Sequence, residues 1–268
     1  MSDQAALAPG AGRGSALLKW LLAGLLLGLV APAWAAPLKV AVASNFLAPL
    51  EALADVYHQR GGPALQISAG ATGQLYAQIT QGAPYDVFLA ADQARPQRLV
   101  AEGAALADSR MTYARGRLVL WARPGVELPV NGLAGLQRSS VTRLAIANPA
   151  LAPYGRAARE ALQASGQWSV LSERIVQGQN VGQALQYLAT GNVSHALVAA
   201  SYTRLDEGPA GDHQPVDAQL YAPIRQDAVI LSGAASADQA RAFLAFLRGP
   251  AAADVLASFG YRPAGGSR

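Results

Sequence analysis

Short apolar runs that end in small residues and lead directly into helical patterns constrain the fold of this chain more than any other feature. The clearest lies at residues 38–46, where an alternating apolar run ends at Ser44 and Asn45. Apolar residues then recur at helical spacing, at Leu50, Leu53 and Tyr57. A period of two predicts a short buried strand, and the spacing that follows it predicts a helix. The sequence therefore predicts a strand that runs directly into a helix.

The same kind of junction recurs along the chain. Three further apolar runs lead into helices through small or polar residues: 64–68 into 70–73, 144–147 into 148–155, and 174–176 into 178–182. Additional strands are expected at 85–91, 118–122, 195–200 and 227–231, and two final helices at 237–248 and 251–258. Strands that alternate with helices indicate an α/β fold with mostly parallel sheets. Ligands of such sheets bind beyond the carboxyl ends of the strands, where all four junctions would lie.

Ser44 and Asn45 have two interpretations. Both residue types are favoured helix caps, because a side-chain oxygen can accept a hydrogen bond from one of the unpaired N–H groups at a helix start. The same N–H groups, together with the helix dipole, form a site for an anion. One junction alone would favour simple capping, whereas four junctions at one edge of a fold favour a ligand site.

The first 35 residues have the pattern of a secretory signal peptide. Arg13 and Lys19 precede an apolar run over residues 21–30, and Ala33 and Ala35 form an A-x-A cleavage pattern. The apolar run is short for a membrane span and is followed by Pro32. We expect cleavage after residue 35, with residue 36 as the alternative, and export of the rest of the chain.

Composition excludes several classes of function. The chain has 268 residues and no cysteine, which excludes a disulfide framework, a thiolate metal site, a thiol nucleophile and a lipid-modified cysteine at the mature N-terminus. Loss of residues 1–35 would lower the formal net charge only from +4 to +3, because that segment holds Arg13, Lys19 and Asp3. A charge this small and this dispersed argues against a nucleic-acid partner. Neither a Walker A motif nor a dinucleotide fingerprint occurs, so any ATP hydrolysis must belong to another chain.

Catalytic interpretations have little support in the sequence. Asp86 and Asp92 could form an acid/base pair, but a turn and a helix cap explain both carboxylates. Ser44 could be a nucleophile only if a histidine lay within hydrogen-bond reach. The candidates His58, His195 and His213 are predicted to lie late in a helix, at a strand start and in a loop. No G-x-S-x-G motif is present. We therefore expect no enzyme activity.

Five stretches of the mature chain together resemble the periplasmic molybdate-binding proteins of ABC transporters, the ModA family. They are VASNFL at 42–47, ATG at 71–73, GAPYDVFLAAD at 82–92, NPALAPYG at 148–155 and NVGQA at 180–184. The resemblance implies a two-lobed periplasmic binding protein of type II, in which crossing strands join two α/β lobes that close on the ligand. It implies that residues 37–116 and 225–268 form lobe 1 and that residues 117–224 form lobe 2.

The resemblance also implies which residues hold the ligand. In that family neutral donors hold a tetrahedral oxyanion without a countercharge. Carried over to this chain, Ser44 and Thr72 would donate hydroxyl and amide groups, the amide of Asn45 would lie beside them, and Tyr154 and Val181 would donate backbone N–H groups. The metal would be held only as its oxyanion, with no direct protein ligand and no cofactor. The chain departs from one branch of the family in having Ala199 where that branch has a tyrosine, and from many relatives in having Ala71 in place of serine.

The function implied is capture of molybdate, and of tungstate as well, by a monomeric periplasmic receptor that delivers the anion to the membrane permease subunits of an ABC importer. Discrimination against sulfate would rest on the size of the cavity. Two alternatives remain open from the residues alone: a receptor for another oxyanion or a small carboxylate, and a secreted serine hydrolase that uses Ser44.

Overall fold

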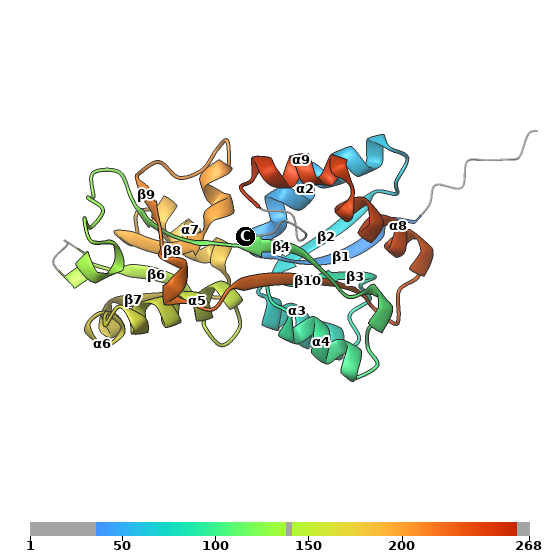
Figure 1. Ribbon diagram of the computed structural model, residues 1–268, viewed down its shortest axis with the longest axis horizontal. Helices are drawn as coiled ribbons and strands as arrows, with labels where there is room; N and C mark the ends of the chain where they lie inside the picture. Colours follow the sequence, from blue (N-terminus) through green and yellow to red (C-terminus); the bar gives the residue numbers. More distant parts are fainter. Residues whose placement is uncertain (1–35, 138–140, 262–268) are drawn as a thin grey trace, which may run out of the picture. The chain divides into compact units, whose positions relative to one another are not determined.

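The computed structural model describes residues 36–137 and 141–261 of the chain, so the predicted signal peptide lies outside the described residues. Residues 37–268 form one compact unit that contains two five-stranded sheets. The first sheet has the order β2-β1-β3-β10-β4, and the second has the order β7-β6-β8-β5-β9 (Figure 1). No helix among the described residues is long and apolar enough to span a bilayer.

The first sheet is mixed. Strand β1 pairs in parallel with β2 and β3, while β10 pairs antiparallel with β3 and β4. Its strands are β1 (Leu38–Ala43), β2 (Leu65–Gly70), β3 (Val87–Leu89), β4 (Met111–Gly116) and β10 (Ile224–Ile230). The parallel part confirms the prediction from alternating strands and helices.

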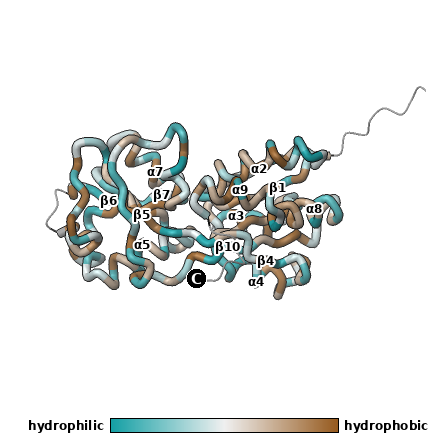
Figure 2. Tube along the Cα trace, turned by 45° about the horizontal axis from the view of Figure 1, so that its top comes forward, coloured by the Kyte–Doolittle hydropathy of each residue, from teal (hydrophilic) through white to brown (hydrophobic). Residues whose placement is uncertain are grey.

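Helices cover both faces of the first sheet, because successive side chains of a strand point to opposite faces. Val40 and Val42 of β1 pack in a core with residues of α2, α8 and α9, whereas Ala41 packs in a second core with α3 and α4. The helices are α2 (Leu47–Gln59), α3 (Thr72–Thr80), α4 (Ala94–Ala101), α8 (Ala237–Arg248) and α9 (Pro250–Ser258), and the 3₁₀ turns are η1 (Ser44–Phe46) and η2 (Ala107–Ser109). Hydrophobic and hydrophilic residues alternate along α2 in Figure 2, as expected for a helix with one buried face.

The second sheet has the same mixed design. Strand β6 pairs in parallel with β7 and β8, and β5 pairs antiparallel with β8 and β9. Its strands are β5 (Leu118–Ala122), β6 (Leu144–Ala147), β7 (Ile175–Gly178), β8 (His195–Ala199) and β9 (His213–Pro215). Its helices are α5 (Pro153–Ala164), α6 (Trp168–Leu171) and α7 (Val181–Ala189), with 3₁₀ turns η3 (Gly132–Gln137), η4 (Ser172–Arg174), η5 (Ala200–Arg204) and η6 (Ala218–Leu220).

Two segments connect the sheets. The chain leaves the first sheet at Gly116, enters the second at Leu118, and returns to the first at Ile224. Most predicted elements agree with the structure: residues 118–122, 144–147 and 237–248 have the predicted bounds. The strand expected over 85–91 is shorter, strand β4 was not predicted, and the segment around His213, predicted as a loop, is strand β9.

Candidate functional site: a cavity at the ends of the strands

A small cavity lies where the ends of strands from both sheets meet. Its volume is about 10 Å³, the space that a single buried water molecule requires. All five residues expected to hold the ligand line it, together with six small or apolar neighbours: Ser44, Asn45, Thr72, Tyr154 and Val181, with Ala43, Gly70, Ala71, Ala91, Ala152 and Pro153. None of these described lining residues carries a carboxylate, an amine, a guanidinium or an imidazole. The cavity can therefore hold an anion only with neutral donors.

Helix starts supply these donors. Helices α3, α5 and α7 begin at Thr72, Pro153 and Val181, and turn η1 begins at Ser44 and continues into α2. The first N–H groups of a helix have no partner within the helix, and the helix dipole adds partial positive charge there. Four such starts converge on one cavity, an arrangement that favours a small anion.

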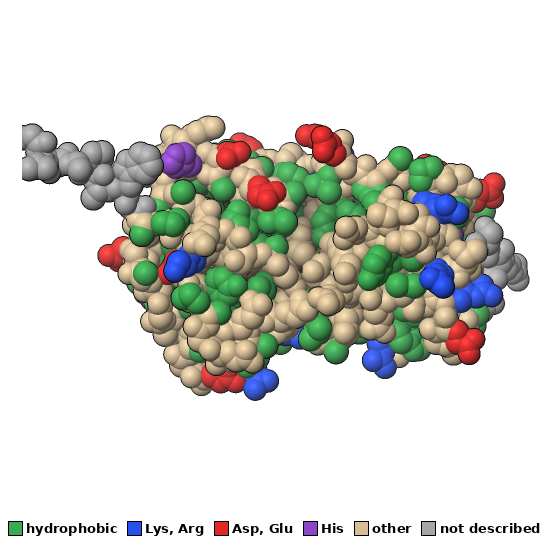
Figure 3. Space-filling model, turned by 180° about the vertical axis from the view of Figure 1, so that it is seen from behind, with side chains coloured by type: hydrophobic (Ala, Val, Ile, Leu, Met, Phe, Trp, Pro, Cys, Tyr) green, Lys and Arg blue, Asp and Glu red, His purple; other side chains and the backbone are tan. Residues whose placement is uncertain are grey.

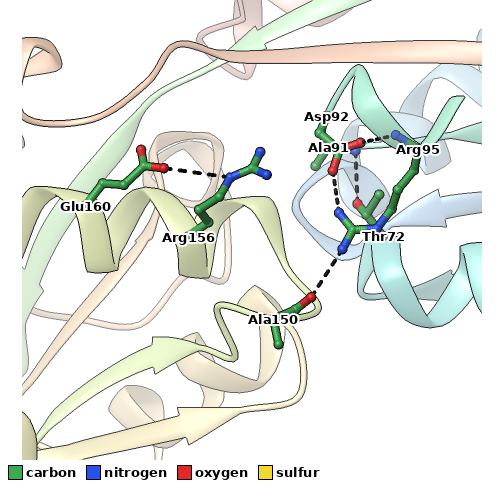
Figure 4. Close-up of polar contacts among 7 residues, drawn as sticks. All are labelled: Thr72, Ala91, Asp92, Arg95, Ala150, Arg156 and Glu160. Carbon is green, nitrogen blue, oxygen red and sulfur yellow. Dashed lines mark hydrogen bonds and ion pairs between the residues drawn. The ribbon is translucent and has the colours of Figure 1, made fainter. Parts of the chain in front are cut away.

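Thr72 adds a hydroxyl donor. Its Oγ1 accepts a hydrogen bond from the backbone N of Ala91 at 3.0 Å, and its side chain is buried (Figure 4). Because Oγ1 is the acceptor in this bond, its own proton remains available for a second partner. Thr72 can therefore donate its hydroxyl proton into the cavity.

Asn45 faces the cavity with its backbone, since its side chain is occupied elsewhere. Its Nδ2 donates to Oε1 of Gln226 at 2.8 Å and to the hydroxyl of Tyr261 at 2.9 Å. Turn η1 has no side-chain cap, so the capping interpretation of Ser44 and Asn45 is wrong. At the fourth junction the capping residue is Asn180, whose Oδ1 accepts from the N of Gln183 at 3.0 Å.

Tyr154 also lines the cavity, and its side chain is almost fully buried. Its hydroxyl is buried without a hydrogen-bond partner among the described residues, beside Gly116 at the end of β4. A Cβ atom built on Gly116 would lie 2.1 Å from that oxygen, so only glycine fits there. Burial, followed by the neighbouring tyrosine hydroxyls, raises the pKa of Tyr154 well above its ordinary value, so the phenol stays neutral.

The two sheets also contact each other around the cavity. The N of Gly73 donates to the carbonyl of Leu151 at 2.8 Å. Figure 4 shows a second contact, in which Nη2 of Arg95 donates to the carbonyl of Ala150 at 3.2 Å. Arg95 is held in place by an ion pair with Asp92. These bonds join α3 and α4 to the loop before α5.

The histidines expected for a hydrolase lie away from this cavity. A ring nitrogen of His58 lies 3.2 Å from the carbonyl of Gly62, His195 contacts Ser194 and Glu127, and the ring of His213 packs against Trp121. None of the three lines the cavity that Ser44 lines. No histidine is therefore placed to activate Ser44 as a base.

The two carboxylates considered for acid/base chemistry have structural partners. Asp86 accepts from the backbone N of Lys39 and of Ala235, each at 2.7 Å. Asp92 accepts from the backbone N of Arg95 at 3.0 Å, which agrees with its predicted capping role. Within the described ranges no group of three or more His, Cys, Asp or Glu side chains could hold a metal ion.

The sequence interpretation missed Ala91 in the cavity wall and the side chains behind it, Ser201, Tyr202, Gln226 and Tyr261. Ala91 ends the strand predicted over residues 85–91 and lies within the GAPYDVFLAAD stretch, whereas no motif singles out the other four residues. Ala199, the position where one branch of the resembling family has a tyrosine, is buried and does not line the cavity.

Comparison with known proteins places the chain in a family. The sequence model of the bacterial extracellular solute-binding protein family matches residues 38–262. The molybdate-binding protein ModA of Azotobacter vinelandii is 43% identical over 249 residues, which cover 91% of this chain and 97% of that protein. ModA of Rhodobacter capsulatus is 39% identical over 237 residues, which cover 88% of this chain and 92% of that protein.

A solved structure supports the same family assignment. The periplasmic molybdate-binding protein of Azotobacter vinelandii aligns with a TM-score of 0.78 at 40% identity, covering 84% of this chain and 98% of that one. The sulfate-binding protein SubI of Mycobacterium tuberculosis aligns with a TM-score of 0.67 at 13% identity and shares the fold. The two helix-flanked sheets are thus those of a two-lobed periplasmic binding protein, and the chain belongs to the ModA family of bacterial extracellular solute-binding proteins.

Proposed function

We propose that this protein is the substrate-binding component of an ABC importer and that it captures molybdate, and tungstate as well. The observation that carries the proposal is the convergence of four helix starts and the Thr72 hydroxyl on one small cavity without a charged side chain. The relatives named as molybdate-binding proteins support it. Ser44 and Thr72 act as hydroxyl and amide donors, and Asn45, Tyr154 and Val181 donate backbone N–H groups.

Neutral donors suit a receptor that must later release its ligand. Preorganised dipoles in a water-excluded site stabilise a dianion, whereas an added buried arginine would make release slower. Sulfate and molybdate share charge and shape, so the fixed size of the cavity has to discriminate between them.

The organisation of the chain follows from the same proposal. Residues 1–35 are a signal peptide that is cleaved on export to the periplasm. Residues 37–116 with 225–268 form lobe 1, and residues 117–224 form lobe 2, an assignment supported by the membership of the strands in the two sheets.

The mature protein acts as a monomer that delivers the anion to the permease subunits. Charged side chains are scattered over the face shown in Figure 3 rather than gathered in one patch, as expected for a protein without a nucleic-acid partner.

Thermal unfolding with molybdate, tungstate, sulfate and phosphate in turn tests the ligand. A ligand that binds only the folded state at 100 times its Kd adds about 2.7 kcal/mol of stability. For a chain of this size, that corresponds to a rise in Tm of about 5–10 °C. We expect this rise with molybdate and tungstate and none with sulfate or phosphate. An equal rise with sulfate would refute selectivity by size.

A substitution in the site tests the residue assignment. Thr72→Val removes the hydroxyl that faces the cavity, and a hydrogen bond to a charged group contributes about 1.5–3 kcal/mol. Titration calorimetry should therefore show a molybdate Kd raised by about 10- to 100-fold. Thr190→Val is the matched control, because the Thr190 hydroxyl bonds the carbonyl of Gln186 within α7, away from the cavity. An unchanged Kd for Thr72→Val would refute the role of this hydroxyl.

A further inference from the structure

Two hydroxyls of turn η5, which follows β8 of the second sheet, donate to backbone carbonyls of turn η1, which follows β1 of the first sheet. Tyr202 donates its hydroxyl to the carbonyl of Ser44 at 3.1 Å, and Ser201 donates its Oγ to the carbonyl of Asn45 at 3.0 Å. Tyr261, which follows α9, lies 3.0 Å from the same Asn45 carbonyl and 3.2 Å from Oγ of Ser201. Ser201 and Tyr202 belong to η5, directly after β8, so their two bonds join the sheets.

These contacts are shielded from water. Asn45, Ser201, Tyr202 and Tyr261 are each exposed by 6% or less. Burial raises the pKa of Tyr202 far above its ordinary value, so its hydroxyl stays protonated and remains a donor. A buried donor that loses its partner costs more than an exposed one, so separation of the sheets must either hydrate these groups or leave them unpaired.

The contacted carbonyls belong to the site itself. The Ser44 carbonyl lies on the same peptide group as the N–H of Asn45, and both residues line the cavity. A hydrogen bond to a peptide carbonyl polarises that group and strengthens its N–H as a donor. Tyr202 also lies against the first turn of α7, because a Cβ on Gly182 would be 3.4 Å from its hydroxyl and 3.7 Å from Cβ of Ser44. Tyr202 therefore fixes turn η1 and the first turn of α7 relative to each other.

We propose that Ser201 and Tyr202 are positioning residues that hold the Ser44–Asn45 backbone against the second sheet and thereby set how tightly the anion is retained. The proposal rests on the function proposed above. The two hydroxyls, here named the hydroxyl latch, stabilise the arrangement of the sheets described above, and neither Ser201 nor Tyr202 lines the cavity. Affinity rises with the population of the binding-competent closed state, so loss of the latch weakens binding even though every ligand donor remains.

Tyr202→Phe and Ser201→Ala test the latch by titration calorimetry with molybdate. Each single variant should raise the Kd by about 3- to 10-fold, the equivalent of one lost hydrogen bond, and the double variant should raise it further. Tyr221→Phe is the matched control. The Tyr221 hydroxyl is similarly buried and accepts from the N of Leu118 at 3.1 Å, but this bond does not join the sheets. Tyr221→Phe should bind molybdate with the Kd of the parent protein, even if the substitution lowers the Tm.

A distance measurement separates the latch from a merely structural role. The chain has no cysteine, so Asp55→Cys on α2 and Ala189→Cys on α7 provide two specific spin-label sites on exposed positions of the two halves. The latch variants should lengthen the distance between the labels in the protein without added ligand, whereas Tyr221→Phe should not.

Each outcome decides between the two proposals. If the parent protein binds molybdate and both latch variants bind it with the same Kd, the latch is refuted while the proposed function stands. If the parent protein binds no oxyanion, the proposed function fails and the label distances alone judge the latch. An unchanged distance distribution in the variants then refutes it, and a longer one supports it.

Discussion

Tyr154 contributes to the cavity through its backbone, while its side chain lies in the core between the two sheets. By distance and angle its buried hydroxyl makes no hydrogen bond among the described residues, although the Tyr261 hydroxyl lies near enough to contribute to its raised pKa. Its place at the second position of α5 leaves its N–H free for a ligand. Backbone and side chain of this residue thus have separate roles that substitution can distinguish.

Tyr154→Phe should leave molybdate affinity unchanged and should not destabilise the protein. Removal of an unpaired buried hydroxyl is neutral or stabilising by about 1 kcal/mol, and the backbone donor remains. Titration calorimetry and urea unfolding measure the two quantities. Tyr113→Phe is the control, because the Tyr113 hydroxyl bonds the Ala90 carbonyl at 3.2 Å and its loss should cost about 1 kcal/mol. A large loss of affinity in Tyr154→Phe would show that the phenol binds the ligand.

At the scale of the elements, the start of α3 belongs to both the cavity and the contact between the sheets. Thr72 lines the cavity, and the next residue, Gly73, donates its N–H to Leu151 of the other half. A Cβ on Gly73 would lie 2.9 Å from the Leu151 carbonyl oxygen and 3.0 Å from Nη2 of Arg95. The glycine permits close approach of α3 to the loop before α5.

Gly73→Ala should therefore weaken ligand binding without weakening the lobe that contains it. Alanine in place of helical glycine favours the helix by up to about 1 kcal/mol, so the ligand-free Tm should not fall by much. The added methyl group holds the two halves apart, and the molybdate Kd should rise by about 10-fold or more. Gly233→Ala is the control, since a Cβ there meets nothing within 4 Å. A Gly73→Ala protein with the parent's Kd would contradict this account.

The strand-to-helix junctions were predictable because their signals are local: an apolar run, small residues and helical spacing follow one another. The five expected site residues line one cavity for the same reason, since parallel strands bring their carboxyl ends to one edge. Strand β4 and the latch residues were not predictable in this way. Met111–Gly116 is a strand because it pairs with β10 more than a hundred residues later, and Tyr202 contacts Ser44 across a sequence separation of 158.

At the scale of the whole molecule, we expect stability to depend on pH through His195, which does not line the cavity. Burial lowers the pKa of His195 below its ordinary value, partly offset by the carbonyl of Glu127. The unfolded chain therefore binds a proton at a higher pH than the folded chain does. The contribution of the neutral imidazole is complete above about pH 6.5 and is lost as the pH falls toward the lowered pKa.

Urea unfolding between pH 7.5 and 5 should thus show a loss of stability that His195→Gln reduces. His58→Gln is the control, because His58 is exposed on α2 and its substitution should leave the profile unchanged. Molybdate affinity should stay flat over the same range, because no carboxylate, amine or imidazole lines the cavity. Identical profiles for the parent and His195→Gln would show that His195 does not carry the dependence.

The fit of the Tyr154 hydroxyl against Gly116 has a consequence for the history of this family. A side chain at position 116 and an aromatic hydroxyl at position 154 exclude each other, although 38 residues separate them in the chain. A lineage that gains a methyl group at the first position must shorten the residue at the second, or move the start of α5 and with it the backbone N–H that we propose as a donor to the anion. Aligned sequences of related receptors should therefore show these two columns changing together, with glycine kept wherever tyrosine is kept.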